Sequence, residues 1–191
     1  MPEFKFNDQD HSYWRGSQRL YGVTDVINDN GLMNGTDFFT EESRDRGKAV
    51  HVACELLFWN NLDWASVDKR IFGYVVSCAE FIAETGFKPK RTEFKAYHPE
   101  LGYAGTWDGD GDTAKLKGIL FDLKSGVRAK WHGYQTAAYL ELARVKGFNI
   151  KHRGSLYLQE NGSCGKFREH TDRNDWKVFV SALNLSKARD L

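Results

Sequence analysis

An aspartate and a lysine stand two positions apart near the end of an apolar run, GILFDLKSG, at residues 118–126. In a β-strand alternate side chains share a face, so Asp122 and Lys124 leave one face together while Phe121 and Leu123 point to the other. A second acid, Asp108, ends an alternating stretch upstream, and a hairpin between the two strands would bring it near Asp122. Two carboxylates that face one point repel each other unless one is protonated or a cation is bound. The pattern therefore predicts a divalent metal site.

Oxygen-rich ligation of this kind suits Mg²⁺ or Mn²⁺. Such an ion lowers the pKa of a bound water and stabilises charge on a phosphate under attack. Lys124 could orient that water or neutralise the transition state. Asp110 and Asp112, in a Gly/Asp-rich segment, are expected to serve a turn rather than the metal.

The composition is that of a folded protein, with 191 residues, 41% hydrophobic and 28% charged. This length predicts one domain. Because 27 Lys and Arg nearly balance 26 Asp and Glu, any polyanion must be bound by a local basic patch. The absence of an 18-residue apolar run or a signal-peptide core predicts a cytoplasmic protein that does not engage a membrane. The three cysteines show no paired spacing, which predicts free thiols.

Periodicity and turn residues predict the order of the elements around these motifs. Residues 1–36 should form a small β element and a short helix capped by Thr24, and residues 37–191 the main core. The core should begin with a helix from about Asp37 to Trp59 and a helix over 65–85. Three strands over 90–126, broken at 98–100 and 109–112, should follow, and then a helix over 131–147. Two strands within 153–171 that turn at Asn161-Gly162, and a final helix over 172–190 capped by Asp172, should complete it. This order predicts an α/β (α+β) domain with helices packed on a central sheet.

Four ordered motifs resemble those of the PD-(D/E)XK nuclease superfamily, in particular its RecB-like exonuclease branch. That branch includes stand-alone phage nucleases and a mitochondrial genome maintenance exonuclease. Its pattern is G-x-x-D, then D/E-x-K, then Q-x-x-x-Y, after an early helix with Arg-Gly before a histidine. This sequence supplies Gly105 to Asp108, Asp122 to Lys124, Gln135 with Tyr139, and Arg46-Gly47 before His51. The resemblance covers most of the chain, although Gly22-Val23-Thr24 stands where phage members often have Ser-Val-Thr.

The resemblance implies a restriction-endonuclease-like core with a central mixed β-sheet flanked by helices. It implies metal ligation by His51, Asp108, Asp122 and the backbone carbonyl of Leu123, with Lys124 catalytic. Gln135 and Tyr139 would position the DNA backbone or brace the site, and Glu93 and Glu55 are candidates for an outer metal position or second shell. Flanking basic residues expected to contact phosphate are Lys117, Arg128, Lys130 and His132.

The implied cofactor is Mg²⁺ or Mn²⁺ alone. Members with an iron-sulfur cluster use three cysteines after the nuclease motifs, whereas this chain has only Cys164 there, so no cluster is expected. No P-loop motif is present, so no nucleotide cofactor is expected and a helicase or recombination protein would be a separate partner.

Each assignment has a structural alternative. The polar stripe formed by Arg44, Lys48, His51 and Glu55 is, by itself, typical of a solvated helix face. Gln135 and Tyr139 could be a tyrosine at the core edge and its hydrogen-bonding neighbour. Trp107, Trp131 and Tyr134 could stack on bases or pack in the core.

Together these features predict a metal-dependent DNA exonuclease of phage or prophage type that acts in recombination, replication or DNA processing. A structure-specific or nicking endonuclease on the same core is the alternative enzyme. A catalytically inactive DNA-binding or partner-binding protein is the alternative of another class, which the intact His51, Asp108, Asp122 and Lys124 disfavour. The motifs leave strandedness and polarity open.

Overall fold

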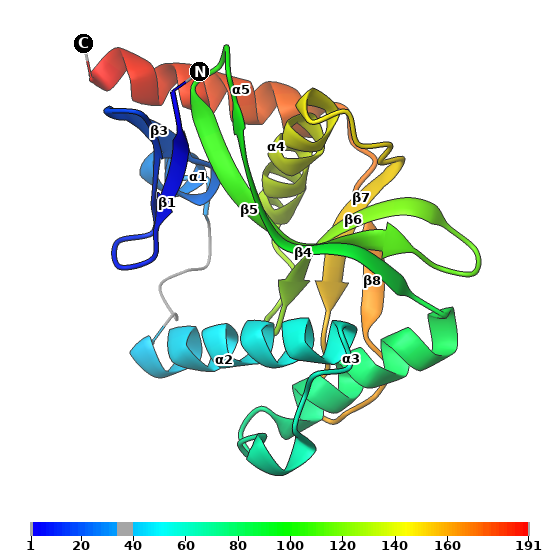
Figure 1. Cartoon of the computed structure of the whole chain (residues 1–191). Coiled ribbons are helices and arrows are strands. Elements are labelled where there is room, and N and C mark those ends of the chain that lie inside the picture. Colours follow the sequence, from blue (N-terminus) through cyan, green and yellow to red (C-terminus); the bar gives the residue numbers. More distant parts are fainter. Residues whose placement is uncertain (1, 34–39, 191) are drawn as a thin grey trace.

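A mixed sheet lies at the centre of the structure and helices flank both of its faces (Figure 1). The computed structural model describes residues 2–33 and 40–190. The strands are β1 (Phe4–Asn7), β2 (Ser12–Arg15), β3 (Gln18–Gly22), β4 (Lys88–His98), β5 (Tyr103–Asp112), β6 (Lys117–Lys124), β7 (His152–Tyr157) and β8 (Lys166–Glu169). The helices are α1 (Val23–Asp29), α2 (Glu41–Phe58), α3 (Phe72–Thr85), α4 (Trp131–Val145) and α5 (Asn174–Arg189). The predicted α/β class with a central mixed sheet is confirmed.

Strand β5 connects the parts of the sheet. It pairs antiparallel with β4 along most of its length and with β6 over its last residues, and it pairs parallel with β3 near its start. Helix α4 connects β6 to β7, which pair in parallel, as a helical crossover requires. The small ribbon β1–β2 extends the sheet beyond β3, and β8 pairs antiparallel with β7. Within the described residues, no helix is both long and apolar enough to span a bilayer.

The sheet is buried on both faces, and strand β6 shows why its sequence is a nearly continuous apolar run. Leu120 belongs to the core formed with α1, α4 and α5, whereas Phe121 and Leu123 belong to the core formed with α2 and α3. The predicted alternation of side chains along this strand is therefore confirmed. Buried in the second core, Cys54 and Cys78 are free thiols, as expected.

Two helix starts differ from the prediction. Helix α1 begins directly after Gly22, so Thr24 lies inside the helix and does not cap it. The expected capping residue was wrong because the chain already turns at Gly22, where a β-carbon would collide with the Asp25 carboxylate. Helix α2 begins after Thr40, whose Oγ1 accepts a hydrogen bond from the amide of Ser43 at 3.1 Å. The predicted start at Asp37 and the 36/37 boundary lie outside the described residues.

The helix predicted over 65–85 is broken in the structure. A short 3-10 helix spans Trp64–Ser66, and α3 begins only at Phe72. The cause is local, because aspartates here bind nearby backbone amides and so compete with helical hydrogen bonds. Asp63 Oδ1 accepts from the amide of Ala65, and Asp68 Oδ1 accepts from that of Arg70. The predicted end of α3 at Gly86 is confirmed, with φ of 63° there.

The turn predicted at 109–112 was also wrong, because β5 continues through these residues to Asp112. Asp110 is fully buried and its carboxylate binds Arg91, with N–O distances of 2.8 and 2.6 Å, and accepts from Trp107 Nε1. This buried ion pair holds the segment in the sheet. Asp112 accepts a hydrogen bond from the amide of Gly118, across the turn that follows.

The end of the chain largely follows the prediction. The turn at Asn161-Gly162 is present but belongs to an eight-residue connection between β7 and β8, residues 158–165. Helix α5 begins at Asn174, and Asp172 Oδ1 accepts a hydrogen bond from the Asn174 amide, although Arg173 is the flanking residue.

Candidate active site

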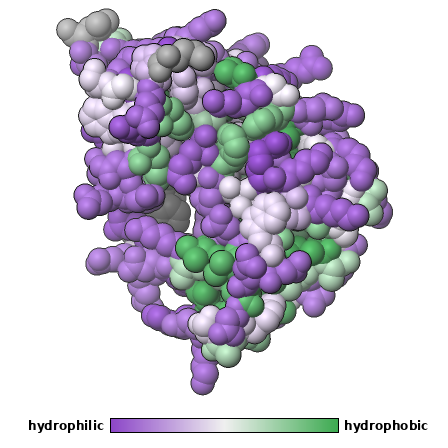
Figure 2. Space-filling view, in the orientation of Figure 1, coloured by the Kyte–Doolittle hydropathy of each residue, from purple (hydrophilic) through white to green (hydrophobic). Residues whose placement is uncertain are grey.

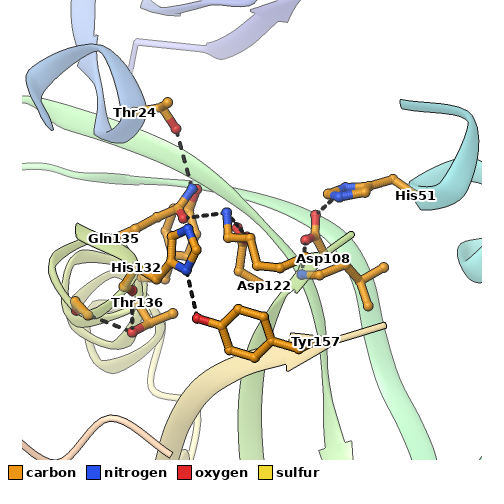
Figure 3. Close-up of polar contacts among 12 residues, drawn as sticks. Thr24, His51, Asp108, Asp122, His132, Gln135, Thr136 and Tyr157 are labelled. Carbon is orange, nitrogen blue, oxygen red and sulfur yellow. Dashed lines mark hydrogen bonds and ion pairs between the residues drawn. The ribbon is translucent and has the colours of Figure 1, made fainter. Parts of the chain in front are cut away.

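The two predicted carboxylates come together where β5 and β6 part. The paired register of these strands runs from Asp112↔Lys117 to Gly109↔Phe121, and the next residues along it are Asp108 and Asp122. Beyond that pair, the amide of Leu123 donates to Asp108 Oδ2 at 2.5 Å instead of to a backbone carbonyl of β5. A side chain thus completes the strand pairing, and it holds Asp108 next to the D-x-K motif (Figure 3).

Strand β4 changes face at Glu93. Residues two apart in a strand normally share a face. Thr92, however, bonds to Glu55 of α2 and to Trp59, which directly follows α2. Phe94 instead packs on Trp107 in the core on the opposite side of the sheet. Glu93 lies between them in the left-handed region, with φ of 45°. This conformation is uncommon for a non-glycine residue and is often found at functional sites. It brings the Glu93 carboxylate towards Asp108.

Helix α2 completes a cluster of three candidate metal ligands. Its His51 places Nδ1 3.2 Å from Asp108 Oδ1. One ligand atom each from His51, Glu93 and Asp108 lie within 4.8 Å of one another. Glu55, one turn after His51, lies beside this cluster and accepts a hydrogen bond from Thr92 Oγ1 at 3.1 Å. Glu93 therefore belongs to this candidate ligand group, although an outer position was expected for it. Asp122 lies outside the group of three.

Burial and like charges act on the carboxylates. Burial, and then the charge of Asp108, raises the pKa of Glu93 to about 8. Burial raises the pKa of Asp122 to about 6 even though Lys124 acts in the opposite direction. Burial alone would lower the pKa of His51, but Asp108 outweighs it and raises the value to about 9. The same ion pair holds the pKa of Asp108 below its usual range against the effect of its own burial. Near pH 7 and without a metal ion, Glu93 is therefore mostly protonated and His51 mostly charged, which offsets the negative charge of Asp108.

Lys124 lies beside Asp122 and is held by α4. Its Nζ is 2.6 Å from Asp122 Oδ2, donates to Gln135 Oε1 at 3.0 Å and lies 4.6 Å from the centroid of the Trp131 ring. The contact with Asp122 is an ion pair without hydrogen-bond geometry. Asp122 Oδ2 is therefore a buried oxygen that accepts no hydrogen bond from the described residues. The Lys124 ammonium is the cation that faces this oxygen.

Gln135 is oriented by two further contacts. Its Nε2 donates to Tyr139 Oη at 3.1 Å and to Thr24 Oγ1 of α1 at 3.4 Å, a weak bond. Tyr139 is buried and packs on β5 beside Gly105, where a β-carbon would lie 2.7 Å from the tyrosine ring. The glycine of the G-x-x-D motif thus makes room for the tyrosine of the Q-x-x-x-Y motif. This arrangement braces Lys124 and leaves Tyr139 no surface for DNA.

A cavity of about 390 Å³ adjoins the site, and His51 and Lys124 form part of its wall. It is lined by Ser43, Arg44, Arg46, His51, Leu123, Lys124, Ser125, Gly126, Val127, Arg128, Ala129, Trp131 and His132. Arginines from α2 and from the loop after β6 therefore converge on one space. Arg128 lies 5.6 Å from the centroid of the Tyr157 ring. Lys130 is exposed nearby but does not line the cavity.

Two of the four predicted phosphate contacts have other partners in the structure. Lys117 is at the opposite end of β6 and donates to the carbonyl of Thr113. His132 is buried against Tyr157, with Nδ1 2.7 Å from its hydroxyl, and burial lowers the pKa of His132 to about 3, so it carries no charge. Of the aromatic residues, Trp107 is fully buried in the core, and Trp131 and Tyr134 are nearly so.

Sequence reasoning missed the arginines of α2 and the contact of Thr24 with Gln135. Arg44 and Arg46 fall on the helix that carries His51, and their i, i+2 spacing gives no sign that both reach one cavity. A signal for Arg46 existed in the Arg-Gly that precedes the histidine. Thr24 is more than 100 residues from Gln135 in the chain, and only the tertiary structure brings them together.

Comparisons with known proteins give a likeness of fold. No protein-family model and no curated protein matches the sequence. Among solved structures, a candidate exonuclease from Eubacterium rectale is similar, with a TM-score of 0.52 and 14% identity over 89% of this chain and 79% of the other. An alkaline exonuclease from Laribacter hongkongensis has a TM-score of 0.43 and 13% identity, over 90% of this chain and 89% of that one. At such identities the first likeness shows a shared fold: a central mixed sheet flanked by helices.

Proposed function

We propose that this chain is a metal-dependent DNA exonuclease of the RecB-like branch of the PD-(D/E)XK superfamily, a single nuclease domain over residues 1–191. The observation that carries the proposal is the arrangement of Asp108, Asp122 and Lys124 where β5 and β6 part, with His51 on Asp108. The fold shared with the Eubacterium rectale candidate exonuclease supports it. A role in phage or prophage recombination, replication or processing, in the host cytoplasm, belongs to the same proposal.

The residues that would hold the ion are His51, Glu93, Asp108 and Asp122, with the Leu123 carbonyl beside them. Three of these side chains already offer atoms within 4.8 Å of one another, and Asp122 adds a buried carboxylate beside Lys124. Carboxylate-rich donors favour Mg²⁺ or Mn²⁺, of which Mn²⁺ accepts an imidazole more readily. When bound, such an ion supplies a more acidic water and stabilises negative charge on a phosphate oxygen.

Lys124 has the geometry of a catalytic cation. Because Gln135 Oε1 and Asp122 Oδ2 hold its ammonium from two sides, little reorganisation is needed when charge develops on the phosphate. Lys124 would therefore orient the attacking water or neutralise the phosphate in the transition state.

The basic residues around the adjoining cavity would hold the DNA backbone. Arg44, Arg46 and Arg128 face the same space as Lys124, in a chain whose net charge is only +1. Such a local patch provides the phosphate contacts that the overall charge does not. Lys130 could contribute at the rim. Strand opening, where required, would fall to a separate helicase or recombination protein.

The decisive experiment is digestion of end-labelled linear and closed circular DNA, single- and double-stranded, with Mg²⁺ or Mn²⁺. Wild type, Lys124→Ala and Lys117→Ala are compared; Lys117 lies on the same strand at the far end, so its substitution is a matched control. We expect stepwise loss of linear DNA alone, loss of that activity in Lys124→Ala by several orders of magnitude, and no change in Lys117→Ala.

The other outcomes separate the alternatives. Cutting of closed circles would replace the exonuclease by an endonuclease. If folded wild-type protein binds DNA but cuts no substrate with either ion, the catalytic proposal fails and a DNA-binding role takes its place.

A further inference from the structure

Helix α2 and its C-terminal flanking residue carry two neighbouring rows of side chains at the metal cluster, one polar and one apolar. Arg44, Lys48, His51 and Glu55 form a polar row. Next to it, at the i, i+4, i+7 spacing of one helix face, lie Val52, Leu56 and Trp59, which are 58%, 40% and 45% exposed. Figure 2 shows hydrophobic side chains gathered over this helix on a surface that is otherwise largely hydrophilic. An apolar row of this kind beside a charged site indicates a ligand with both apolar and anionic parts.

The tryptophan at the end of this row is fixed in place. Trp59 Nε1 donates to Thr92 Oγ1 at 2.9 Å, and Thr92 Oγ1 donates in turn to Glu55 Oε1. Thr92 directly precedes Glu93 of the metal cluster. The indole is therefore attached to the strand that carries a candidate ligand, while nearly half of its surface stays open to solvent. A fixed, exposed aromatic ring is what base stacking requires, because little side-chain freedom is lost on binding.

We propose that Trp59 is a stacking platform for an unpaired nucleobase of the substrate, and that the strand lies along α2. This inference rests on the proposed function, since it deepens the choice of substrate towards single-stranded nucleic acid. Trp59 follows His51 by eight residues, about 12 Å along the helix axis, so the stacked base lies a few nucleotides from the bond under attack. Arg44 and Lys48 of the polar row then face the phosphates and the apolar row faces the bases.

The position of Trp59 distinguishes it from an incidental surface aromatic. Trp64 is 42% exposed as well, but its ring packs edge-on against Phe72, with centroids 6.0 Å apart, and it belongs to the 3-10 helix that follows α2 in the chain. The two tryptophans have nearly equal exposure and differ in their relation to the site. Trp64 is therefore a matched control.

The test is fluorescence anisotropy of a labelled single-stranded oligonucleotide in EDTA, so that nothing is cut. Base stacking predicts that Trp59→Ala binds about 5- to 100-fold more weakly, that Trp59→Phe loses less, and that Trp64→Ala binds like wild type. Thr92→Val should produce part of the Trp59→Ala loss, because it releases the indole. A blunt duplex should show no dependence on Trp59.

An abasic scan makes the result specific to stacking. In wild type, an oligonucleotide that lacks the base at one particular position, or at either of two neighbouring positions, should bind more weakly. Trp59→Ala should bind these abasic oligonucleotides as well as it binds the intact one. The proposal is overturned if Trp59→Ala, folded as judged by circular dichroism, binds like wild type, if the abasic penalty persists without the indole, or if wild type does not bind the oligonucleotide. If binding depends on Trp59 but no DNA is cleaved in Mn²⁺, the proposed nuclease function is wrong, whereas the stacking role of Trp59 is supported.

Discussion

Leu123, through its backbone amide, binds the Asp108 side chain across the point where β5 and β6 separate. Since Leu123 lies between Asp122 and Lys124, this one bond fixes the separation of the G-x-x-D and D-x-K motifs. The other oxygen of the same carboxylate faces His51. Asp108 is thus the residue on which β5, β6 and α2 converge.

Replacing Asp108 by Asn should lower the pKa of His51. In the structure, the charge of Asp108 raises that pKa to about 9 against the effect of burial. Without the carboxylate, burial dominates and the value should fall to 6.5 or below. NMR titration of the His51 ring in metal-free protein measures it. A value that stays near 9 would show that Asp108 is not the cause.

Metal-free protein should lose stability as the pH rises from 6 to 9. The folded-state pKa of Glu93, about 8, lies above its ordinary value of 4.5, and that of His51, about 9, lies above 6.5. A raised folded-state pKa adds stability that is fully present below the unfolded value and is lost as the pH rises through the folded value. Thermal unfolding in EDTA at a series of pH values measures the trend. Glu93→Gln is the control, because it should flatten the slope and raise the melting temperature at pH 9; a slope unchanged in this variant would contradict the assignment.

Mn²⁺ should stabilise the wild-type protein, and the stabilisation should grow with the logarithm of the Mn²⁺ concentration above the dissociation constant. Binding to the folded state alone predicts about 2.7 kcal/mol at 100 times the dissociation constant. Asp108→Asn should abolish this stabilisation, and Glu93→Gln should weaken Mn²⁺ binding by about tenfold or more. Calorimetric titration gives the affinities directly. Equal Mn²⁺ binding in wild type and Asp108→Asn would place the ion elsewhere.

Much of the fold followed from local pattern. The apolar run of β6 predicted a strand, and an expected hairpin with β5 predicted Asp108 near Asp122. The two residues do lie together, but through a turn at residues 113–116 and not at the predicted 109–112. The roles that family resemblance gives to the site residues stay predictions. Their proximity is a property of the structure.

The errors had physical causes that local pattern does not contain. The Gly/Asp-rich segment at 109–112 has turn chemistry, but Arg91, about 20 residues away, pairs with Asp110 and keeps the segment in the sheet. Glu93 adopts a positive φ that no propensity assigns to glutamate, so its approach to His51 could not be foreseen from strand alternation. Both outcomes depend on tertiary contacts that override local preference.

Removing one member of the buried ion pair between Arg91 and Asp110 should cost about 3–5 kcal/mol of unfolding free energy. Asp110→Ala leaves the guanidinium over Phe148 without its carboxylate and Trp107 Nε1 without an acceptor. Lys90→Ala is the matched control, because its pair with Asp112 is exposed and should be worth about 0–1 kcal/mol. Urea unfolding measures both. Folded Asp110→Ala should retain its metal affinity, and a loss of Mn²⁺ binding would instead make Asp110 part of the metal site.

Gln135→Leu should reduce the rate of the chemical step more than it weakens DNA binding. The glutamine accepts a hydrogen bond from Lys124 Nζ, and its own orientation depends on Tyr139 Oη. Leucine therefore leaves the ammonium with Asp122 and the Trp131 ring alone among these contacts. A misplaced catalytic group can cost about 100-fold in rate. Single-turnover cleavage separates rate from affinity. Tyr139→Phe should have a smaller effect, and the double variant should be no slower than Gln135→Leu alone, because the tyrosine hydroxyl acts on Lys124 only through the amide it orients. Additive losses would mean that Tyr139 acts on the site by another route.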